Sequence, residues 1–480
     1  MAASFYWHDY ETWGNQPGRD RPCQFAGLRT DEALQEIGEP LVLYCRPGDD
    51  LLPHPDACLV TGITPEIAHE RGLPEAEFAR AIQQQLARPE TCAVGYNSLR
   101  FDDQVTRWLF YHNLLDPYAH AWQNGNSRWD LIDVLRLAHA LRPDGIEWPQ
   151  REPGVTSFKL EDLTVANAIP HAGAHDALAD VRATLALARM LRSAQPHLFD
   201  YALTLRDKHE VKRRLATGKP LLHVSQRYPA ARGCIAPIAV VADHPKSPNT
   251  VLCFDLREDP TQLLDHSPED LRRRLFAPAA DQPQGLDRLP VKGIKINAAP
   301  MLAPMGTLTA EAAARWSIDP EQVAQHAQQA TRHRDEIGER LRQAYAQEDS
   351  TEFSDDPEAM LYTGGFFPDA DRREMARLAT LTPDELAGEQ PRFEDARLST
   401  LLFRMRARSW PRTLSEDERE DWDAWRLERL TDPEAGASLT IEAFEARLAT
   451  LRSERASDPA ALAILDRLEA WGERVMSAEY

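Results

Sequence analysis

The chain of 480 residues is longer than one hydrophobic core usually supports, so we expect two or three domains. Hydrophobic residues make up 42% of the sequence, which excludes wholesale disorder, and no apolar run approaches the roughly 18 residues of a membrane helix. The formal net charge of -21 argues, taken as a sum, against a polyanion as ligand.

The first 195 residues alternate apolar strands with amphipathic helices. We expect strands at Ser4–Trp7, Leu41–Cys45 and Thr91–Gly95, and helices at Glu75–Leu86, Asp102–Leu114 and Asp176–Leu191. Strands that alternate with helices predict an α/β layer fold around a central sheet. A proline in Ser193–Asp200, just past the last helical pattern, marks the end of this region.

The region from about 196 to 350 opens with a basic helical segment, Arg206–Arg214. Short β-like runs follow, as a small β-rich domain requires: Leu221–Val224, Ile235–Val241, Thr250–Asp255 and Val291–Ile296. Residues 201–250 hold nine Lys and Arg against three Asp and Glu, which fits either a polyanion groove or a solvated face. Residues 351–480 carry apolar side chains at helical spacing and predict a helical domain.

Six cysteines are scattered along the chain without a C-x-x-C pair, so they indicate neither a zinc site nor a disulfide framework. The stretch Met1–Tyr10 has no basic part followed by an apolar part, so we expect no secretory signal. These features predict a cytoplasmic protein with buried free thiols and no membrane attachment.

Asp9 and Glu11 follow the apolar run Phe5–Trp7 in the first expected strand. Residues i and i+2 of a strand face the same side, so the two carboxylates lie about 7 Å apart along the chain. Hard oxygen ligands of this kind select Mg²⁺ or Mn²⁺. Alone, however, most such pairs are simply the polar face of a strand.

Asp102 and Asp103 begin the helix that follows the turn Gly95-Tyr-Asn. Helical spacing places Asp102 at the edge of the apolar face that carries Val105 and Trp108, and it places Asp103 almost opposite. We therefore expect Asp102 to face a site beside the core and Asp103 to be solvated. Either acid also suits a helix N-terminus because of the helix dipole.

His175-Asp176-Ala-Leu-Ala-Asp180 opens the last helix of the first region. Asp176 suits a helix cap, whereas Asp180 lies one turn further on, beside small residues that permit close packing against a sheet. His175 precedes the helix, and histidine side chains commonly accept a proton from an attacking water. Four carboxylates in this order could hold two Mg²⁺ ions roughly 3.5–4 Å apart, an arrangement that serves phosphodiester hydrolysis.

The order D-x-E, then D, then H-x-x-x-x-D resembles the DEDDh class of 3′→5′ exonucleases. Further motifs are similar to the bacterial exodeoxyribonuclease I family: Arg21-Pro-Cys-Gln-Phe-Ala, Thr61-Gly-Ile-Thr-Pro, Asn126-Ser-Arg-Trp-Asp-Leu, Lys219-Pro-Leu-Leu-His-Val-Ser and Gly364-Gly-Phe-Phe. They are spread over essentially the whole chain, so the resemblance covers more than the nuclease region.

The resemblance implies a processive 3′→5′ exonuclease that hydrolyses single-stranded DNA to 5′-mononucleotides by two-metal-ion catalysis in DNA repair and recombination. It implies Asp9, Glu11, Asp102 and Asp180 as ligands of two Mg²⁺ ions, with Mn²⁺ as a substitute, and His175 as the catalytic histidine. The implied architecture is an RNase H-like (DnaQ-like) exonuclease domain over 1–195, an SH3-like β-barrel domain over 196–350 and a C-terminal α-helical domain over 351–480. We expect a monomer.

A groove for single-stranded DNA needs cations for the phosphates and aromatic faces for the bases. Besides Glu11, the candidate substrate contacts are Arg107, Tyr118, Trp122, Arg128, Arg136 and Lys159. Tyr118 and Trp122 are four residues apart, so they could stack on one helix face, or they could belong to the core. Lys159 stands where the resemblance implies an arginine for a substrate phosphate, which keeps the charge but loses the bidentate fork.

The family also docks the acidic C-terminal tail of single-stranded DNA-binding protein, a ligand that needs a cation beside an apolar pocket. Arg142, Tyr201 and Lys219 match this role by motif position, although ordinary surface residues would look the same.

Three alternatives remain open. Another DEDDh nuclease, such as a proofreading subunit, RNase T or an oligoribonuclease, is mostly a single domain and leaves about 285 residues unexplained. A non-catalytic single-strand-binding scaffold would not need all five catalytic positions. A carboxylate metal site in an unrelated hydrolase would not need this order of motifs.

Overall fold

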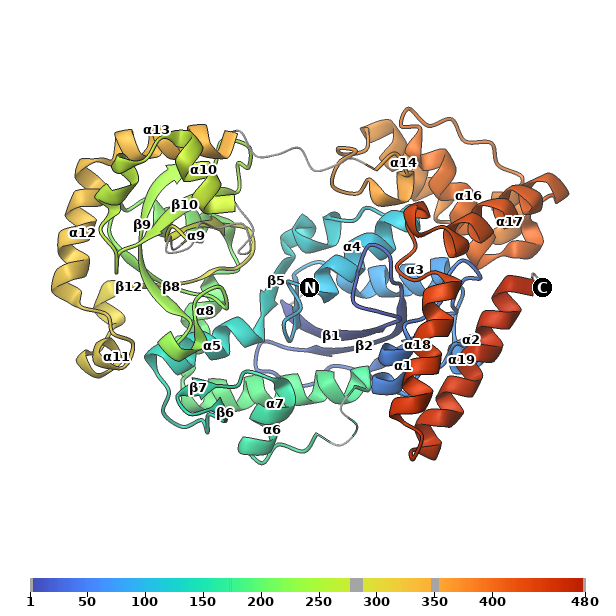
Figure 1. Cartoon of the computed structure of the whole chain (residues 1–480), viewed down its shortest axis with the longest axis horizontal. Coiled ribbons are helices and arrows are strands. Elements are labelled where there is room, and N and C mark those ends of the chain that lie inside the picture. Colours follow the sequence, from blue (N-terminus) through green and yellow to red (C-terminus); the bar gives the residue numbers. More distant parts are fainter. Residues whose placement is uncertain (1–2, 172, 174, 277–287, 347–353, 478–480) are drawn as a thin grey trace. The chain divides into compact units, whose positions relative to one another are not determined.

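The computed structural model describes residues 3–171, 173, 175–276, 288–346 and 354–477 (Figure 1). The chain forms two compact units. Unit 1 combines residues 1–127, 171–182 and 352–480, and unit 2 combines residues 128–170 and 183–351. None of the helices within the described ranges is long and apolar enough to cross a membrane.

One five-stranded sheet has the strand order β3-β2-β1-β4-β5. Unit 1 contains β1 (Ser4–Thr12), β2 (Pro22–Thr30), β3 (Leu41–Tyr44) and β4 (Thr91–Gly95), whereas β5 (Ser127–Asp130) begins at the last residue of this segment of unit 1 and continues into unit 2. β1 pairs antiparallel with β2, where Glu11 lies opposite Gln24, and it pairs parallel with β4. A β-carbon at Gly27 would lie 2.2 Å from the hydroxyl of Tyr6, so this close approach of β2 to a core tyrosine requires glycine.

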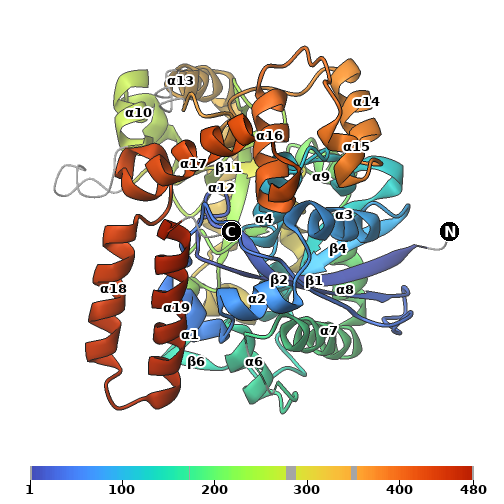
Figure 2. The same cartoon turned by 90° about the vertical axis from the view of Figure 1, so that its right-hand side faces the viewer.

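The N-terminal part of unit 1 adds helices α1 (Pro55–Thr61), α2 (Pro65–Arg71), α3 (Glu75–Leu86) and α4 (Asp102–His112), and short 3-10 turns η1 (Ala119–Ala121) and η2 (Gln123–Gly125). α3 and α4 lie on one side of β1 and β2, and the first turns of α7 (Ala177–Ala194) lie on the other (Figures 1 and 2). Phe78 and Ile82 of α3 and Val105 of α4 pack against Phe25 of the sheet. Their helical spacing explains why both helices were predicted.

Residues 354–477 of unit 1 contain only helices, which confirms the helical prediction for this part of the chain. The elements are η7 (Pro357–Ala359), α14 (Asp369–Leu378), α15 (Pro383–Ala387), α16 (Arg397–Ser409), η8 (Pro411–Thr413), α17 (Glu416–Thr431), η9 (Pro433–Ala435), α18 (Ile441–Glu454) and α19 (Pro459–Ser477). Phe444 and Trp471 share a core with Trp13 and Leu51, so the C-terminal helices pack directly on the N-terminal region.

Unit 2 is built on an antiparallel sheet with the strand order β11-β10-β9-β8-β12. Its strands are β8 (Leu221–Val224), β9 (Ile235–Asp243), β10 (Thr250–Asp255), β11 (Val291–Lys295) and β12 (Met301–Pro304), and β6 (Gln150–Glu152) pairs separately with β7 (Val155–Thr156). The helical elements are α5 (Leu131–Leu141), α6 (Leu160–Ala166), α8 (Pro196–Thr204), α9 (Lys208–Leu215), η3 (Ala230–Arg232), η4 (Pro260–Asp265), α10 (Pro268–Phe276), η6 (Met305–Thr307), α11 (Ala310–Arg315), α12 (Pro320–Arg332) and α13 (Arg334–Ala346).

All six cysteines are buried and free, as the sequence predicts.

Candidate active site

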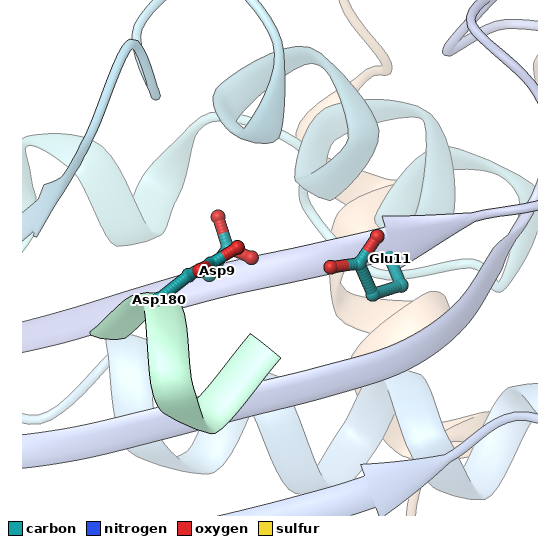
Figure 3. Close-up of side chains that lie close together, drawn as sticks. All are labelled: Asp9, Glu11 and Asp180. Atoms are coloured by element: carbon teal, nitrogen blue, oxygen red, sulfur yellow. The ribbon is translucent and has the colours of Figure 1, made fainter. Parts of the chain in front are cut away.

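Three predicted acids meet at the end of β1. Asp9, Glu11 and Asp180 each offer one carboxylate oxygen, and these three atoms lie within 4.8 Å of one another. Asp9 and Glu11 point to one side of β1, and Asp180 reaches them from the first turns of α7 (Figure 3). Tyr10 lies between the two acids in sequence and turns into the core, where its ring is 4.8 Å from that of Phe25. Strand alternation therefore separates the acids from the core, as predicted.

Asp180 can approach the sheet because the first turn of α7 carries a small side chain there. Ala177 is completely buried, and its N–H donates to the Gln24 side chain of β2. A larger side chain at this position would push the helix away from the strands. Ala177 thus helps to bring the carboxylate of Asp180 within reach of Asp9.

Asp102, the fourth acid, is hydrogen-bonded to β1 from helix α4. It lies at the start of α4, is 4% exposed, and its Oδ1 accepts a hydrogen bond of 3.1 Å from the backbone N–H of Tyr10. β4 pairs with β1 only as far as Trp7, so Tyr10 lies beyond that ladder and its N–H is available to the helix. Asp102 is outside the set of three atoms within 4.8 Å, yet it is close enough to influence Asp9 and Glu11 electrostatically.

The acids disfavour one another's ionised form. Burial raises the pKa of Glu11 to about 8, and the charges of Asp180 and Asp102 add to that rise. Burial also raises the pKa of Asp9 well above its usual range, together with the charges of Asp102 and Glu11. A divalent cation would relieve this repulsion, and a set of carboxylate oxygens is the donor set that hard cations prefer. The residues present therefore fit a metal site.

The prediction that Asp103 is solvated is wrong. Asp103 is 6% exposed, and its Oδ2 forms an ion pair of 2.9 Å with Arg107 one turn further along α4. The prediction assumed that α4 is covered on one face only. Burial lowers the pKa of His8 on β1, and the negative charge of Asp103 opposes that shift. Both acids at the start of α4 are therefore buried rather than solvated.

His175 lies in the turn before α7, half-buried and with a left-handed backbone at φ 68°. His171, four residues earlier, contacts Asp180, with 2.5 Å between His171 Nε2 and Asp180 Oδ1. Sequence reasoning missed His171 because this residue lies in irregular backbone before the helix. In such backbone, sequence spacing does not determine which side chains meet. Asp176 acts as the predicted cap, since its Oδ2 accepts the N–H of Ala179 at 3.3 Å.

Gln24 of β2 is a second residue that the sequence reasoning did not assign. Its side-chain amide donates to Asp176 Oδ1 at 3.1 Å, and its carbonyl accepts the N–H of Ala177 at 3.1 Å. Its only signal in the sequence is its place in the motif Arg21-Pro-Cys-Gln-Phe-Ala.

The predicted DNA contacts in unit 1 do not form a stacked pair on one helix. Tyr118 precedes η1 and Trp122 follows it, so no single α-helix carries both residues. Tyr118 is half-buried beneath the Arg107 guanidinium at 5.4 Å and meets Phe366 edge to face at 5.5 Å, whereas Trp122 is 65% exposed. Their spacing of four was misread as helical because the chain makes short 3-10 turns here.

The predicted DNA contacts in unit 2 differ in exposure. Lys159 is exposed at the N-terminus of α6. Arg128 is half-buried and donates to the carbonyl of Asn297 at 3.2 Å. Arg136 is 6% exposed and forms an ion pair of 2.7 Å with Asp133.

The predicted partner-binding residues also lie in unit 2. Arg142 is half-buried and donates to the carbonyl of Thr307 at 3.0 Å, and Lys219 is exposed. The Tyr201 hydroxyl donates to the carbonyl of Leu302 at 2.7 Å, and the Arg214 guanidinium covers the Tyr201 ring at 4.4 Å.

Comparisons with known proteins agree along the whole chain. Residues 6–188 match the exonuclease family, residues 206–347 the exonuclease I SH3-like domain, and residues 355–475 the exonuclease I C-terminal domain. The predicted order of exonuclease, SH3-like and C-terminal helical domains is thereby confirmed, while the boundaries near 195 and 350 stay predictions.

Individual relatives are similar over their full length. The chain is 42% identical to exodeoxyribonuclease I of Escherichia coli K12, over 99% of both chains. A solved structure of a moderately thermophilic exonuclease I from Methylocaldum szegediense is 47% identical with a TM-score of 0.94, over 99% of this chain and 100% of that one. E. coli exonuclease I in complex with a dA16 oligonucleotide is 42% identical with a TM-score of 0.93, over 98% of this chain and 100% of that one. The chain therefore belongs to the exodeoxyribonuclease I family.

Proposed function

We propose that this protein is a processive 3′→5′ exonuclease that hydrolyses single-stranded DNA to 5′-mononucleotides. The observation that carries the proposal is the meeting of Asp9, Glu11 and Asp180 within 4.8 Å, in a chain that aligns over its full length with exodeoxyribonuclease I. A cluster of carboxylates whose ionised forms repel one another suits a cation at the cleavage site better than it suits a structural role.

The proposed ligands are Asp9, Glu11, Asp102 and Asp180, holding two Mg²⁺ ions that Mn²⁺ can replace. Bound ions of this kind polarise the phosphate and stabilise the charge that develops on the leaving oxygen. Asp102 keeps its orientation through the hydrogen bond from the Tyr10 N–H. We assign His175, in the turn beside α7, as the group that accepts the proton of the attacking water. Glu11 also faces the substrate at this edge of the sheet.

Each unit supplies proposed DNA contacts. In unit 1, Arg107 offers a cation, and Tyr118 and exposed Trp122 offer aromatic faces. In unit 2, Arg128, Arg136 and Lys159 offer cations for phosphates. We rank exposed Lys159 above buried Arg136, because a phosphate can reach the former without breaking an existing ion pair.

We further propose that Arg142, Tyr201 and Lys219 receive the acidic C-terminal tail of single-stranded DNA-binding protein. The set combines two cations with an aromatic residue, the side-chain types that a terminal carboxylate beside an apolar side chain needs. The protein would act as a cytoplasmic monomer in DNA repair and recombination.

The test is digestion of a single strand labelled separately at its 3′ and 5′ ends. With Mg²⁺ we expect the 3′ label to appear first, as a mononucleotide, and EDTA to stop the reaction. Asp180→Asn should abolish release while leaving DNA binding in a mobility-shift assay largely unchanged. Early release of the 5′ label, activity in EDTA, or full activity of Asp180→Asn would contradict the proposal.

A further inference from the structure

The first turn of α7 is fastened to the sheet by one buried side chain, that of Gln24. Gln24 is 1% exposed, lies on β2 opposite Glu11, and uses both ends of its amide. The carbonyl accepts the Ala177 N–H at 3.1 Å, and the amide nitrogen donates to Asp176 Oδ1 at 3.1 Å. The N–H groups of a first helical turn have no partner within the helix, so this bond gives α7 a fixed point of attachment.

Asp180 lies one turn further along α7. Its carboxylate is held by His171, which precedes the helix. Nε2 of His171 lies 2.5 Å from Asp180 Oδ1, and the two side chains are 5% and 16% exposed. A carboxylate has two oxygens with about four lone-pair sites, so a hydrogen bond from His171 is compatible with a cation on the same carboxylate. His171 thereby restricts the rotation of the Asp180 side chain.

We propose that Gln24 and His171 are positioning residues for Asp180: Gln24 sets the register of α7 against β1 and β2, and His171 sets the orientation of the carboxylate. The inference rests on the proposed role of Asp180 as a metal ligand. Neither residue is among the five predicted catalytic residues, and neither is assigned contact with the substrate.

The need for such restraint follows from the charges in the site. One carboxylate oxygen of Asp180 lies within 4.8 Å of one oxygen each from Asp9 and Glu11, so three like charges are held close together. Before a cation is bound, this repulsion favours rotation of Asp180 away from β1. Hydrogen bonds from outside the ligand set oppose the rotation, and the loss of such outer bonds typically weakens metal binding by about 10- to 100-fold.

The experiment measures Mn²⁺ binding to the metal-free full chain by electron paramagnetic resonance, without DNA. His171→Ala removes the bond to Asp180. Gln24→Glu keeps the shape of the side chain and an oxygen that accepts the Ala177 N–H. It replaces the amide that donates to Asp176 with a carboxylate, which repels the Asp176 carboxylate. We expect each change to weaken Mn²⁺ binding about tenfold and to raise the Mg²⁺ concentration for half-maximal activity by a similar factor. Much of kcat should return at saturating Mg²⁺, and His171→Gln, which keeps an N–H donor, should restore part of the affinity.

Matched controls separate positioning from general damage. His69→Ala on α2 and Gln84→Glu on α3 change exposed residues outside the site and should bind Mn²⁺ like the unaltered chain. Thermal melting shows whether each variant is folded, and His171→Ala remains informative if the buried Gln24 variant unfolds.

The results distinguish this inference from the proposed function. Unchanged Mn²⁺ binding in folded His171→Ala and Gln24→Glu, with weakened binding in Asp180→Asn, would overturn the positioning role alone. Tighter binding in His171→Ala would also overturn it, since His171 would then compete with the ion. Unchanged binding in Asp180→Asn would instead overturn the proposed ligand set.

Discussion

At the scale of single residues, Asp9 and Glu11 occupy positions where ionisation is unfavourable. Burial and the neighbouring carboxylates raise the pKa of both groups. Strand geometry explains why they cannot separate, since residues i and i+2 of β1 are held on one side by pairing with β2. The fold therefore maintains a repulsion that a bound cation would relieve, and this has a measurable consequence in the absence of metal.

In EDTA, we expect the stability gained by Glu11→Gln to grow as the pH rises from about 5 to 8. The pKa of Glu11 is raised from 4.5 to about 8 in the folded chain. Between these values the folded chain keeps a proton that the unfolded chain has released, so the stability of the folded chain falls as the pH rises. Glutamine cannot ionise and removes this dependence.

The measurement is a series of melting curves over that pH range. Glu70→Gln, at an exposed position on α2, is the control and should follow the unaltered chain. A Glu11→Gln advantage that does not increase with pH would show that Glu11 is already ionised in the metal-free protein.

Lys159→Arg should strengthen the binding of single-stranded DNA. Lys159 is exposed at the start of α6, where a guanidinium could replace a point charge with a bidentate contact to phosphate. We expect Lys159→Arg to lower KM about fivefold, which corresponds to roughly 1 kcal/mol, with kcat nearly unchanged.

Lys159→Ala should raise KM. It should also reduce the slope of log KM against log salt concentration by about 0.7, the value for one phosphate contact on a single strand. An unchanged slope would remove Lys159 from the DNA contacts.

At the scale of elements, α4 begins with two adjacent acids that the structure treats differently. Asp102 accepts a hydrogen bond from β1, and Asp103 forms an ion pair with Arg107 on its own helix. Both are buried, so exposure does not tell them apart. Their partners do: one carboxylate lies beside the acids of β1, and the other neutralises a cation.

The pair of variants Asp102→Asn and Asp103→Asn should therefore separate activity from stability. Asp102→Asn should lower kcat by at least about a hundredfold, because a proposed metal ligand is lost while the shape of the side chain is kept. Asp103→Asn should keep most of the activity but lose about 1–3 kcal/mol of unfolding free energy, because the largely buried Arg107 loses its counter-charge. Urea unfolding and single-strand digestion check both variants. Equal effects on both quantities would contradict the division.

Elements with a clear apolar pattern were predictable from the sequence, and those without one were not. α3 and β4 lie at the predicted bounds: the apolar residues of α3 repeat at helical spacing, and β4 is a short run of mostly apolar residues that ends at Gly95. β2 was not predicted, because the polar residues Gln24 and Arg29 interrupt its apolar residues, although all nine positions are buried in the fold. β1 continues to Thr12, past the apolar run, because its polar residues still pair with β2.

The candidate site was predictable where the chain is regular. Strand alternation placed Asp9 and Glu11, and the helical pattern placed Asp180 near the start of α7. The error at Asp103 arose because helical spacing was read as giving one buried face, whereas the first turn of α4 is buried at Asp103 as well as at Asp102. His171 could not be found, because positive φ angles at Gly173 and His175 bend the chain in a way that spacing does not encode.

At the scale of the whole molecule, unit 1 joins segments that are far apart in the sequence. Arg408 of α16 is 2% exposed and lies between Asp50 at 2.8 Å and Glu358 at 2.5 Å, both of which are also buried. Burial alone would raise the pKa of Asp50, but Arg408 and Arg21 lower it to about 2. The C-terminal helices are thus bound to the N-terminal region through paired buried charges as well as the shared apolar core.

This arrangement predicts that Arg408→Met destabilises the protein far more than the loss of a surface pair. Methionine leaves Asp50 and Glu358 buried without their main counter-charge, and breaking a buried pair in this way typically costs about 3–5 kcal/mol. Arg452→Met is the matched control, because Arg452 also bridges two acids, Asp466 and Glu469, at 2.6 and 2.7 Å, but on the surface of α18 and α19.

Exposed pairs contribute at most about 1 kcal/mol, so Arg452→Met should unfold in urea close to the unaltered chain. The unfolding midpoint of Arg408→Met should move to a lower urea concentration. The N-terminal region and the C-terminal helices should unfold together, since they share one core. Protection against hydrogen exchange, measured separately in the two segments, would show this. If the C-terminal helices lost protection while residues 1–127 kept theirs, the two segments would unfold independently. The prediction that they form one cooperative unit would then be wrong.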